Sequence, residues 1–181
     1  PFNYGHLRST ETVIIEQDII NKYKKVKNFS EYQSFLKSNE IILDHDERKT
    51  KILKRFEAVC KSKNFKESFN NRLLEEVTNI VDNPNILVVE FNKDYLKIPQ
   101  EIIISTLENQ QKYFPLFNKK DELTNYFLIV ANKVDKKNLI KKGNKKVVEA
   151  RLSDAKFFWD KDKSKNLIKQ IGKLKTITFY D

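Results

Sequence analysis

Residues 143–159, with the sequence GNKKVVEARLSDAKFFW, carry a helical pattern around which the rest of the chain is organised. Four apolar residues recur at i, i+4, i+7 and i+11 and therefore share one face of an α-helix: Val148, Leu152, Ala155 and Trp159. Val147 and Phe158 widen this apolar face. Because Gly143 and Asn144 interrupt the pattern, we expect the helix to begin after them, with Asn144 as its N-cap.

The same helix has a charged side and ends in aromatic residues. Arg151 and Asp154 lie three residues apart, close enough to pair on the helix surface. An arginine fork can also satisfy backbone carbonyls, so we expect both residues to hold the helix against its neighbours rather than to touch a nucleic acid. Phe158 and Trp159 are predicted to be mostly buried, because the apolar face has to pack inward.

The composition indicates a globular protein from a reducing compartment. The 181 residues are 39% hydrophobic and 12% aromatic, which is enough to bury a sizeable core. Cys60 is the single cysteine, so an internal disulfide is excluded and an inert, buried thiol is expected. No apolar run approaches the roughly 18 residues of a membrane span, so we expect a cytoplasmic protein without a membrane partner. The chain contains no Met and begins with Pro1, which suggests a piece of a longer protein.

The remaining patterns predict an α+β fold, in which a mixed or antiparallel sheet is packed with several amphipathic helices. Apolar or alternating runs predict strands at 13–15, 41–43, 86–91, 114–117, 126–131 and 176–180. Helical spacing and capping residues predict further helices at 30–36, 44–61, 69–81, 99–111 and 167–171. The strands at 114–117 and 126–131 are expected to form a hairpin. We expect one central region over 1–181; its division into a helix-rich subregion, 1–82, and an α+β subregion, 83–181, is the alternative.

Lysine residues crowd into the stretch in front of the helix. The chain has a formal net charge of +10, and seven lysines share this stretch with one aspartate, Asp135: Lys133, Lys136, Lys137, Lys141, Lys142, Lys145 and Lys146. Such a field attracts polyanions, and lysine, as a flexible point charge, suits phosphates better than base edges. We predict a weak, sequence-tolerant and salt-dependent contact with nucleic acid here; a merely solvated lysine-rich loop is the alternative.

No group of residues in the sequence amounts to an active site. His45 lies between Asp44 and Asp46, a pattern found in metal-dependent phosphohydrolases, but the only other histidine is His6, in a different region. There is no glycine-rich phosphate loop and no nucleophile elbow. We therefore predict no catalytic residue and no metal site.

Several sequence blocks together resemble the β subunit of the bacterial heterotetrameric glycyl-tRNA synthetase. They are, in order, LLEEVT at 73–78, QKYFP at 111–115, GNKKVV at 143–148 and RLSDAKFF at 151–158. An apolar strand that continues into Phe-x-x-x-Tyr-Leu-x-Ile-Pro precedes the second block. The residues of this motif to which we give a structural role are Gln111, Tyr113, Phe114, Arg151, Asp154, Phe158 and the adjoining Trp159.

This resemblance implies a role in charging tRNA with glycine. In that family an α subunit holds the class II catalytic core, which uses ATP and Mg, and the β subunit helps to hold the tRNA. The chain would then be a non-catalytic central portion of β, inactive alone and without a cofactor of its own. Its partners would be the α subunit and tRNA-Gly, in an α2β2 enzyme. The alternatives are a free-standing basic RNA-binding module and a hydrolase built on Asp44, His45 and Asp46.

Overall fold

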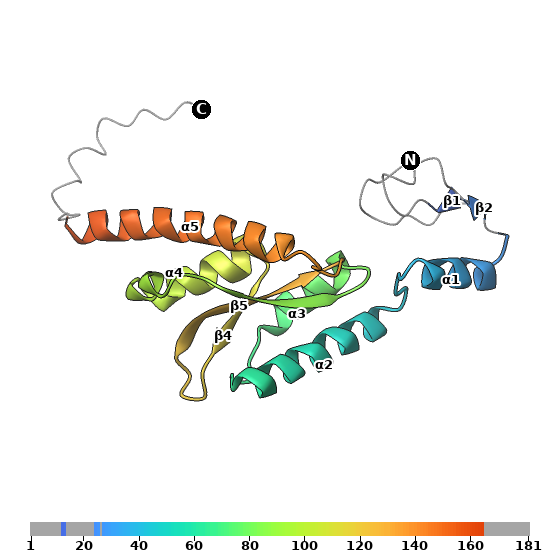
Figure 1. The fold of residues 1–181 in the computed structure, drawn as a ribbon, viewed down its shortest axis with the longest axis horizontal. Coiled ribbons are helices and arrows are strands. Elements are labelled where there is room, and N and C mark those ends of the chain that lie inside the picture. Colours follow the sequence, from blue (N-terminus) through green and yellow to red (C-terminus); the bar gives the residue numbers. More distant parts are fainter. Residues whose placement is uncertain (1–11, 14–23, 26, 165–181) are drawn as a thin grey trace, which may run out of the picture.

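The computed structural model describes residues 12–13, 24–25 and 27–164 (Figure 1). At its centre is a three-stranded antiparallel sheet in the order β3 (Asn85–Glu90), β5 (Leu123–Ala131), β4 (Phe114–Phe117). The α-helices of the described ranges are α1 (Phe29–Ser38), α2 (His45–Lys63), α3 (Asn71–Ile80), α4 (Gln100–Ser105) and α5 (Leu139–Lys163). An antiparallel sheet with helices packed around it confirms the predicted α+β class.

Four short elements complete the described chain. β1 (Thr12–Val13) pairs antiparallel with β2 (Lys24–Lys25). The 3₁₀ turn η2 (Lys93–Lys97) follows β3, and the π-helical segment η3 (Thr106–Gln110) continues directly from α4. The predicted helix at 99–111 is therefore present, with Pro99 at its N-cap and a π-helical second half.

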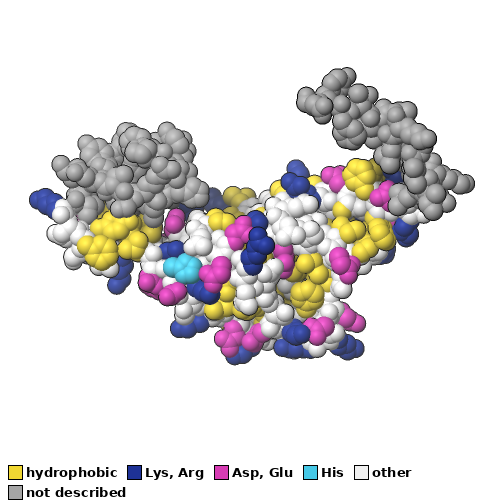
Figure 2. Space-filling view, turned by 180° about the vertical axis from the view of Figure 1, so that it is seen from behind, with side chains coloured by type: hydrophobic (Ala, Val, Ile, Leu, Met, Phe, Trp, Pro, Cys, Tyr) yellow, Lys and Arg dark blue, Asp and Glu magenta, His cyan; other side chains and the backbone are white. Residues whose placement is uncertain are grey.

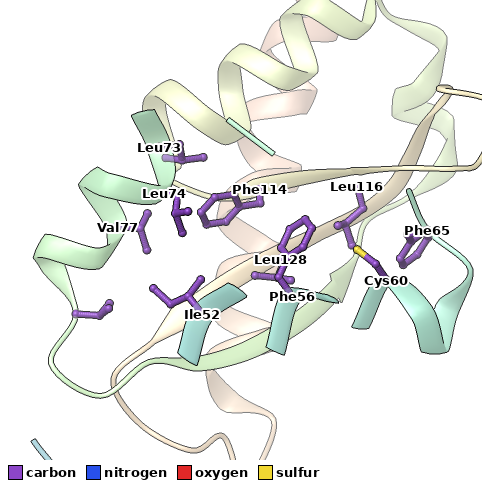
Figure 3. Close-up of a cluster of buried hydrophobic side chains, with 11 residues drawn as sticks. Ile52, Phe56, Cys60, Phe65, Leu73, Leu74, Val77, Phe114, Leu116 and Leu128 are labelled. Atoms are coloured by element: carbon purple, nitrogen blue, oxygen red, sulfur yellow. The ribbon is translucent and has the colours of Figure 1, made fainter. Parts of the chain in front are cut away.

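One face of the sheet packs against α2 and α3. Buried residues of both helices meet the sheet residues Phe114, Leu116 and Leu128 in a first hydrophobic cluster (Figure 3): Ile52, Phe56, Cys60, Leu73, Leu74 and Val77. The Phe56 ring contacts Phe114 edge to face, with 6.1 Å between the ring centroids. This packing uses the apolar faces that helical spacing predicted for residues 44–61 and 69–81.

The other face of the sheet packs against α4, η3 and α5. Here a second hydrophobic cluster joins sheet and helix residues: Val89, Phe91, Ile98, Ile103, Leu107, Phe127, Ile129, Val148 and Leu152. Along β5 the side chains alternate, so that Phe127 and Ile129 enter this cluster while Leu128 enters the first. A sheet covered on both faces explains why residues 86–91 and 126–131 are nearly continuous apolar runs.

Turn and cap chemistry fixes the ends of the elements. Asn118 organises the β4–β5 hairpin, because its Oδ1 accepts hydrogen bonds from the backbone N–H groups of Lys120 (2.8 Å) and Glu122 (3.0 Å). The predicted hairpin is thus confirmed. Asp44 caps α2 by accepting from the N–H of Glu47 at 2.7 Å, which confirms the predicted start of that helix.

Residues 41–43 do not form the predicted strand. The N–H of Ile42 donates to the carbonyl of Asp82 at 3.0 Å, but the carbonyls of Ile42 and Leu43 instead accept from Nη1 of Arg48, each at 2.8 Å. The side chain of Arg48 therefore takes the place of a neighbouring strand. The apolar run instead forms the link between α1 and α2, where Ile41 and Ile42 are half-buried and Leu43 is 42% exposed.

Three predicted elements fall partly or wholly outside the described residues, and of the strand at 13–15 only Val13 is described, as part of β1. The helix at 167–171 and the strand at 176–180 lie beyond residue 164. The helices α2 and α3 share the first cluster with the sheet, so residues on both sides of position 82 contribute to one core. The division into subregions 1–82 and 83–181 stays a prediction.

Candidate nucleic-acid interface

The lysine-bearing helix begins earlier than the sequence pattern predicted. α5 starts at Leu139, so Gly143 and Asn144 lie within it and Asn144 is not its N-cap. Asn144 instead donates from Nδ2 to the carbonyl of Ile140 at 2.8 Å and accepts a hydrogen bond from the Tyr113 hydroxyl. A glycine inside a helix costs about 1 kcal/mol relative to alanine, and this extra tertiary contact helps to offset that cost.

Asp135 supplies the cap that Asn144 was expected to provide. Its Oδ1 accepts from the N–H of Ile140 at 3.1 Å, and its Oδ2 accepts from the N–H of Lys141 at 2.9 Å. Desolvation raises the pKa of Asp135, but these backbone hydrogen bonds and the charge of Lys141 outweigh it, so the net pKa lies below the usual aspartate range. The one aspartate among the lysines is thus the anchor of the helix N-terminus.

We expect Asp135→Ala to lower the melting temperature of the protein at neutral pH. A folded-state pKa below the unfolded value stabilises the fold above the unfolded pKa, about 3.9, and this contribution is lost as the pH falls through the folded value. The melting-temperature difference between wild type and variant, measured by circular dichroism from pH 7 downward, should therefore shrink in acid. A difference that persists unchanged below pH ~2 would show that the carboxylate is not the cause.

The seven lysines lie on a turn and on the first two turns of α5. Lys133, Lys136 and Lys137 belong to the turn after β5, and Lys141, Lys142, Lys145 and Lys146 belong to the helix. All are exposed except Lys141, which is half-buried. The stretch is therefore partly helical rather than a simple loop, and the positive end of the α5 dipole adds to the field of the lysines.

A hollow of about 450 Å³ lies between η2 and this part of α5, and we call it the η2–α5 hollow. Its lining residues are Tyr95, Lys142, Lys145, Lys146, Glu149, Ala150 and Ser153. Oε1 of Glu149 accepts from the backbone N–H of Asn92 at 2.9 Å, and this hydrogen bond ties the start of η2 to α5. The hydrogen bond therefore fixes the position of η2 relative to α5, the two elements that line the hollow.

In the RLSDAKFF block, Arg151 contacts a neighbouring element and does not pair with Asp154. Nη1 of Arg151 donates to Oε1 of Gln110 at 3.4 Å, and within residues 27–164 no ion pair joins Arg151 to Asp154. Arg151 and Asp154 both line an open pocket between α4–η3 and α5. The adjoining residue Gln111 is half-buried at the end of the π-helical segment.

The end of α5 buries only part of its predicted apolar face. Val148 and Leu152 are fully buried, and Ala155 and Trp159 pack against the second cluster, as the spacing predicted. Phe158, however, is 60% exposed, and Trp159 is only half-buried. In Figure 1, α5 extends beyond α4 and the sheet, so that its last turns have fewer neighbours among the described residues.

The aromatic residues of the QKYFP block belong to the core. Phe114 is buried in the first cluster, and Tyr113 stacks on Phe127 in the second, with ring centroids 5.4 Å apart. Burial raises the pKa of the Tyr113 hydroxyl above its usual value. The hydrogen bond from this hydroxyl to Asn144 links the core directly to the lysine-bearing turns of α5.

The remaining chemically distinctive residues do not assemble into a site. His45 lies 3.2 Å from Asp46 and 3.4 Å from Glu75, and Figure 2 shows the histidine among acidic and basic side chains on the surface. In the described part of the chain, no three His, Cys, Asp or Glu side chains are placed to hold a metal ion. Cys60 is fully buried, and desolvation, followed by the charge of Glu67, raises its pKa to about 11, which makes the thiol unreactive.

Comparison with known proteins gives the family of the chain. The glycyl-tRNA synthetase beta subunit family matches residues 1–181, and the chain belongs to that family. It is 39% identical to the glycine–tRNA ligase beta subunit of Lactobacillus gasseri over 156 residues, 85% of this chain and 22% of the relative. For the beta subunits of Rickettsia felis and Dictyoglomus thermophilum the identities are 34% and 36%, over 99% and 87% of this chain and 28% and 23% of the relatives.

The chain thus spans about a quarter of the length of these relatives. Because the relatives are named as subunits of a ligase, the free-standing RNA-binding module is not favoured. None of the helices in the described ranges is long and apolar enough to cross a membrane.

Proposed function

We propose that the chain is a non-catalytic portion of a glycine–tRNA ligase β subunit and supports the ATP-dependent attachment of glycine to tRNA. The observation that supports this proposal is the family match over all 181 residues. A class II α subunit would supply the reacting groups, ATP and Mg²⁺, and this chain would be inactive alone. The assembled enzyme would be α2β2, would act in the cytoplasm and would take tRNA-Gly as its substrate.

The contribution proposed for this portion is a contact with the phosphate backbone of the tRNA. Six exposed lysines gather on the turn after β5 and on the start of α5: Lys133, Lys136, Lys137, Lys142, Lys145 and Lys146. The carboxylate of Asp135 accepts hydrogen bonds from the backbone N–H groups of Ile140 and Lys141, so its negative charge also stabilises the N-terminus of α5. The aromatic rings of Tyr113 and Phe114 are held in the core and are not available to stack on bases. Backbone contact without base reading is therefore the expected mode.

We expect a variant with these six lysines changed to glutamine to raise the Michaelis constant for tRNA in the assembled enzyme. Each lost lysine–phosphate contact should also reduce the steepness of the salt dependence by about one unit in a double-logarithmic plot. The measurement is glycine charging at several salt concentrations, with tRNA as the varied substrate. The maximal rate should change little, because none of the six is proposed to act in the chemical step.

A matched control neutralises Lys54 and Lys63, which are exposed on α2 at the opposite face of the sheet. This control measures how much tRNA affinity falls when positive charge is lost far from the proposed contact. If each lost lysine raised the Michaelis constant for tRNA by the same factor in the two variants, the loss of net charge alone would explain the effect. An unchanged Michaelis constant and salt dependence in the six-lysine variant would exclude this stretch as a tRNA contact.

A further inference from the structure

The η2–α5 hollow differs from the rest of the lysine-rich surface in shape and in composition. It is a shallow, open depression, and Lys133, Lys136 and Lys137 lie outside it on the exposed turn after β5. Charges that surround one point of the surface add their fields there, and solvent screens charges that lie farther away. Lys142, Lys145 and Lys146 line the hollow together, so their fields add on an anion bound there.

Neighbouring lysines on η2 and α5 are paired with carboxylates, but in the described part of the chain two of the three lysines that line the hollow are not. Lys97 contacts Asp94 at 2.7 Å, Lys156 contacts Asp160 at 2.6 Å, and Lys145 lies 3.8 Å from Glu149. Within residues 27–164, Lys142 and Lys146 form no ion pair. One helical turn separates them, so their Cβ atoms lie about 5–6 Å apart and both ammonium groups can reach the same anion.

Tyr95 adds an uncharged donor on the opposite wall. Its ring packs against the second cluster and its side chain lines the hollow, and its hydroxyl makes no hydrogen bond in the described part of the chain. A phenolic hydroxyl donates well to a phosphate oxygen. The Glu149–Asn92 hydrogen bond holds η2, and with it Tyr95, against α5, so the wall does not have to be ordered when a ligand binds.

We propose that the η2–α5 hollow is the specific phosphate-binding site of this portion, with Lys142 and Lys146 on one wall and the Tyr95 hydroxyl on the other. Its ligand is a phosphodiester of the RNA backbone. The inference therefore rests on the proposed function and assigns the proposed tRNA contact to one site. The lysines of the turn, Lys136 and Lys137 among them, then contribute only a general attraction. Lys145, which lies near Glu149, has a smaller share than its two neighbours.

The test compares two variants that lose the same charge in the full-length subunit, assembled as the active enzyme. Lys142→Gln with Lys146→Gln should weaken the binding of a tRNA-Gly transcript about tenfold and reduce the salt dependence by about two units. Lys136→Gln with Lys137→Gln should change the affinity less than twofold. Tyr95→Phe, which changes no charge, should weaken binding about threefold, an effect that a general electrostatic field does not produce.

The possible outcomes separate this inference from the proposed function. Equal losses in the two lysine pairs, with no effect of Tyr95→Phe, would overturn the hollow as a site while leaving the lysine stretch as a tRNA contact. No loss in either pair or in the six-lysine variant would overturn both. Because Lys142 and Lys146 are exposed, the pair variant should keep the wild-type melting temperature, and Lys142→Arg with Lys146→Arg should keep wild-type binding.

Discussion

Phe127→Ala is expected to lower the free energy of unfolding by about 3–5 kcal/mol, the usual cost of removing a fully buried aromatic side chain. Phe127 lies on the middle strand, β5, with none of its side chain exposed. Its ring contacts those of Phe91 and Tyr113, with centroid distances of 6.2 Å and 5.4 Å. The cavity left by alanine would be bounded by β3, η3 and α5, which cannot all close on it together. Urea denaturation followed by circular dichroism measures the loss.

The control for this variant is the same substitution at an exposed phenylalanine. Phe157 is 60% exposed near the end of α5, so Phe157→Ala should change the free energy of unfolding by no more than about 0.5 kcal/mol. If both substitutions cost the same, the second cluster is not the core that the structure shows. Under the proposed function, a loss at Phe127 should also weaken tRNA binding, since Tyr113, stacked on Phe127, holds Asn144 in the lysine-bearing turns of α5.

The sequence predicted the layers of the fold because burial leaves a clear periodic pattern. Leu152 could be assigned to the core because its neighbours on the helix face are apolar at regular spacing, and Phe127 because it lies in a continuous apolar run. The prediction of a strand at 41–43 was wrong for a reason that the spacing of apolar residues cannot show. Its carbonyls are satisfied by Arg48, a side chain on the following helix, and an apolar tripeptide alone does not reveal which group will take its hydrogen bonds.

The candidate site was harder to predict, because its geometry depends on contacts between distant residues. Asp135 was seen only as a counter-charge, although an aspartate a few residues before an apolar run is itself a capping signal. Tyr95 and Ser153 were missed, since nothing in their local sequence shows that η2 will lie beside α5. Phe158 was predicted to be buried because its spacing fits the apolar face, but spacing does not say how far the neighbouring layer extends.

Leu152→Ala is expected to cost about 2–5 kcal/mol of the free energy of unfolding, and part of that loss should appear as a detached α5. Leu152 is fully buried against the second cluster, where it and Val148 are the only fully buried residues of the helix within the described ranges. Alanine has the higher helix propensity, so the change should not unwind α5 by itself. The loss would come from the cavity and from weaker attachment to the sheet. Thermal unfolding and hydrogen exchange of the α5 amides measure the two effects.

Val147→Ala serves as the matched control for Leu152→Ala because it removes apolar groups from the same helix at a position that is 44% exposed. This substitution should change the free energy of unfolding by less than about 0.5 kcal/mol, because alanine has a higher helix propensity than valine and partly compensates for the lost apolar groups. If Leu152→Ala leaves the fold stable but loosens α5, the proposed phosphate site predicts a lower tRNA affinity although every lysine is still present, because the η2–α5 hollow is formed by both elements. If Val147→Ala instead proves the more damaging of the two, α5 packs on the sheet through a face different from the one that the structure shows.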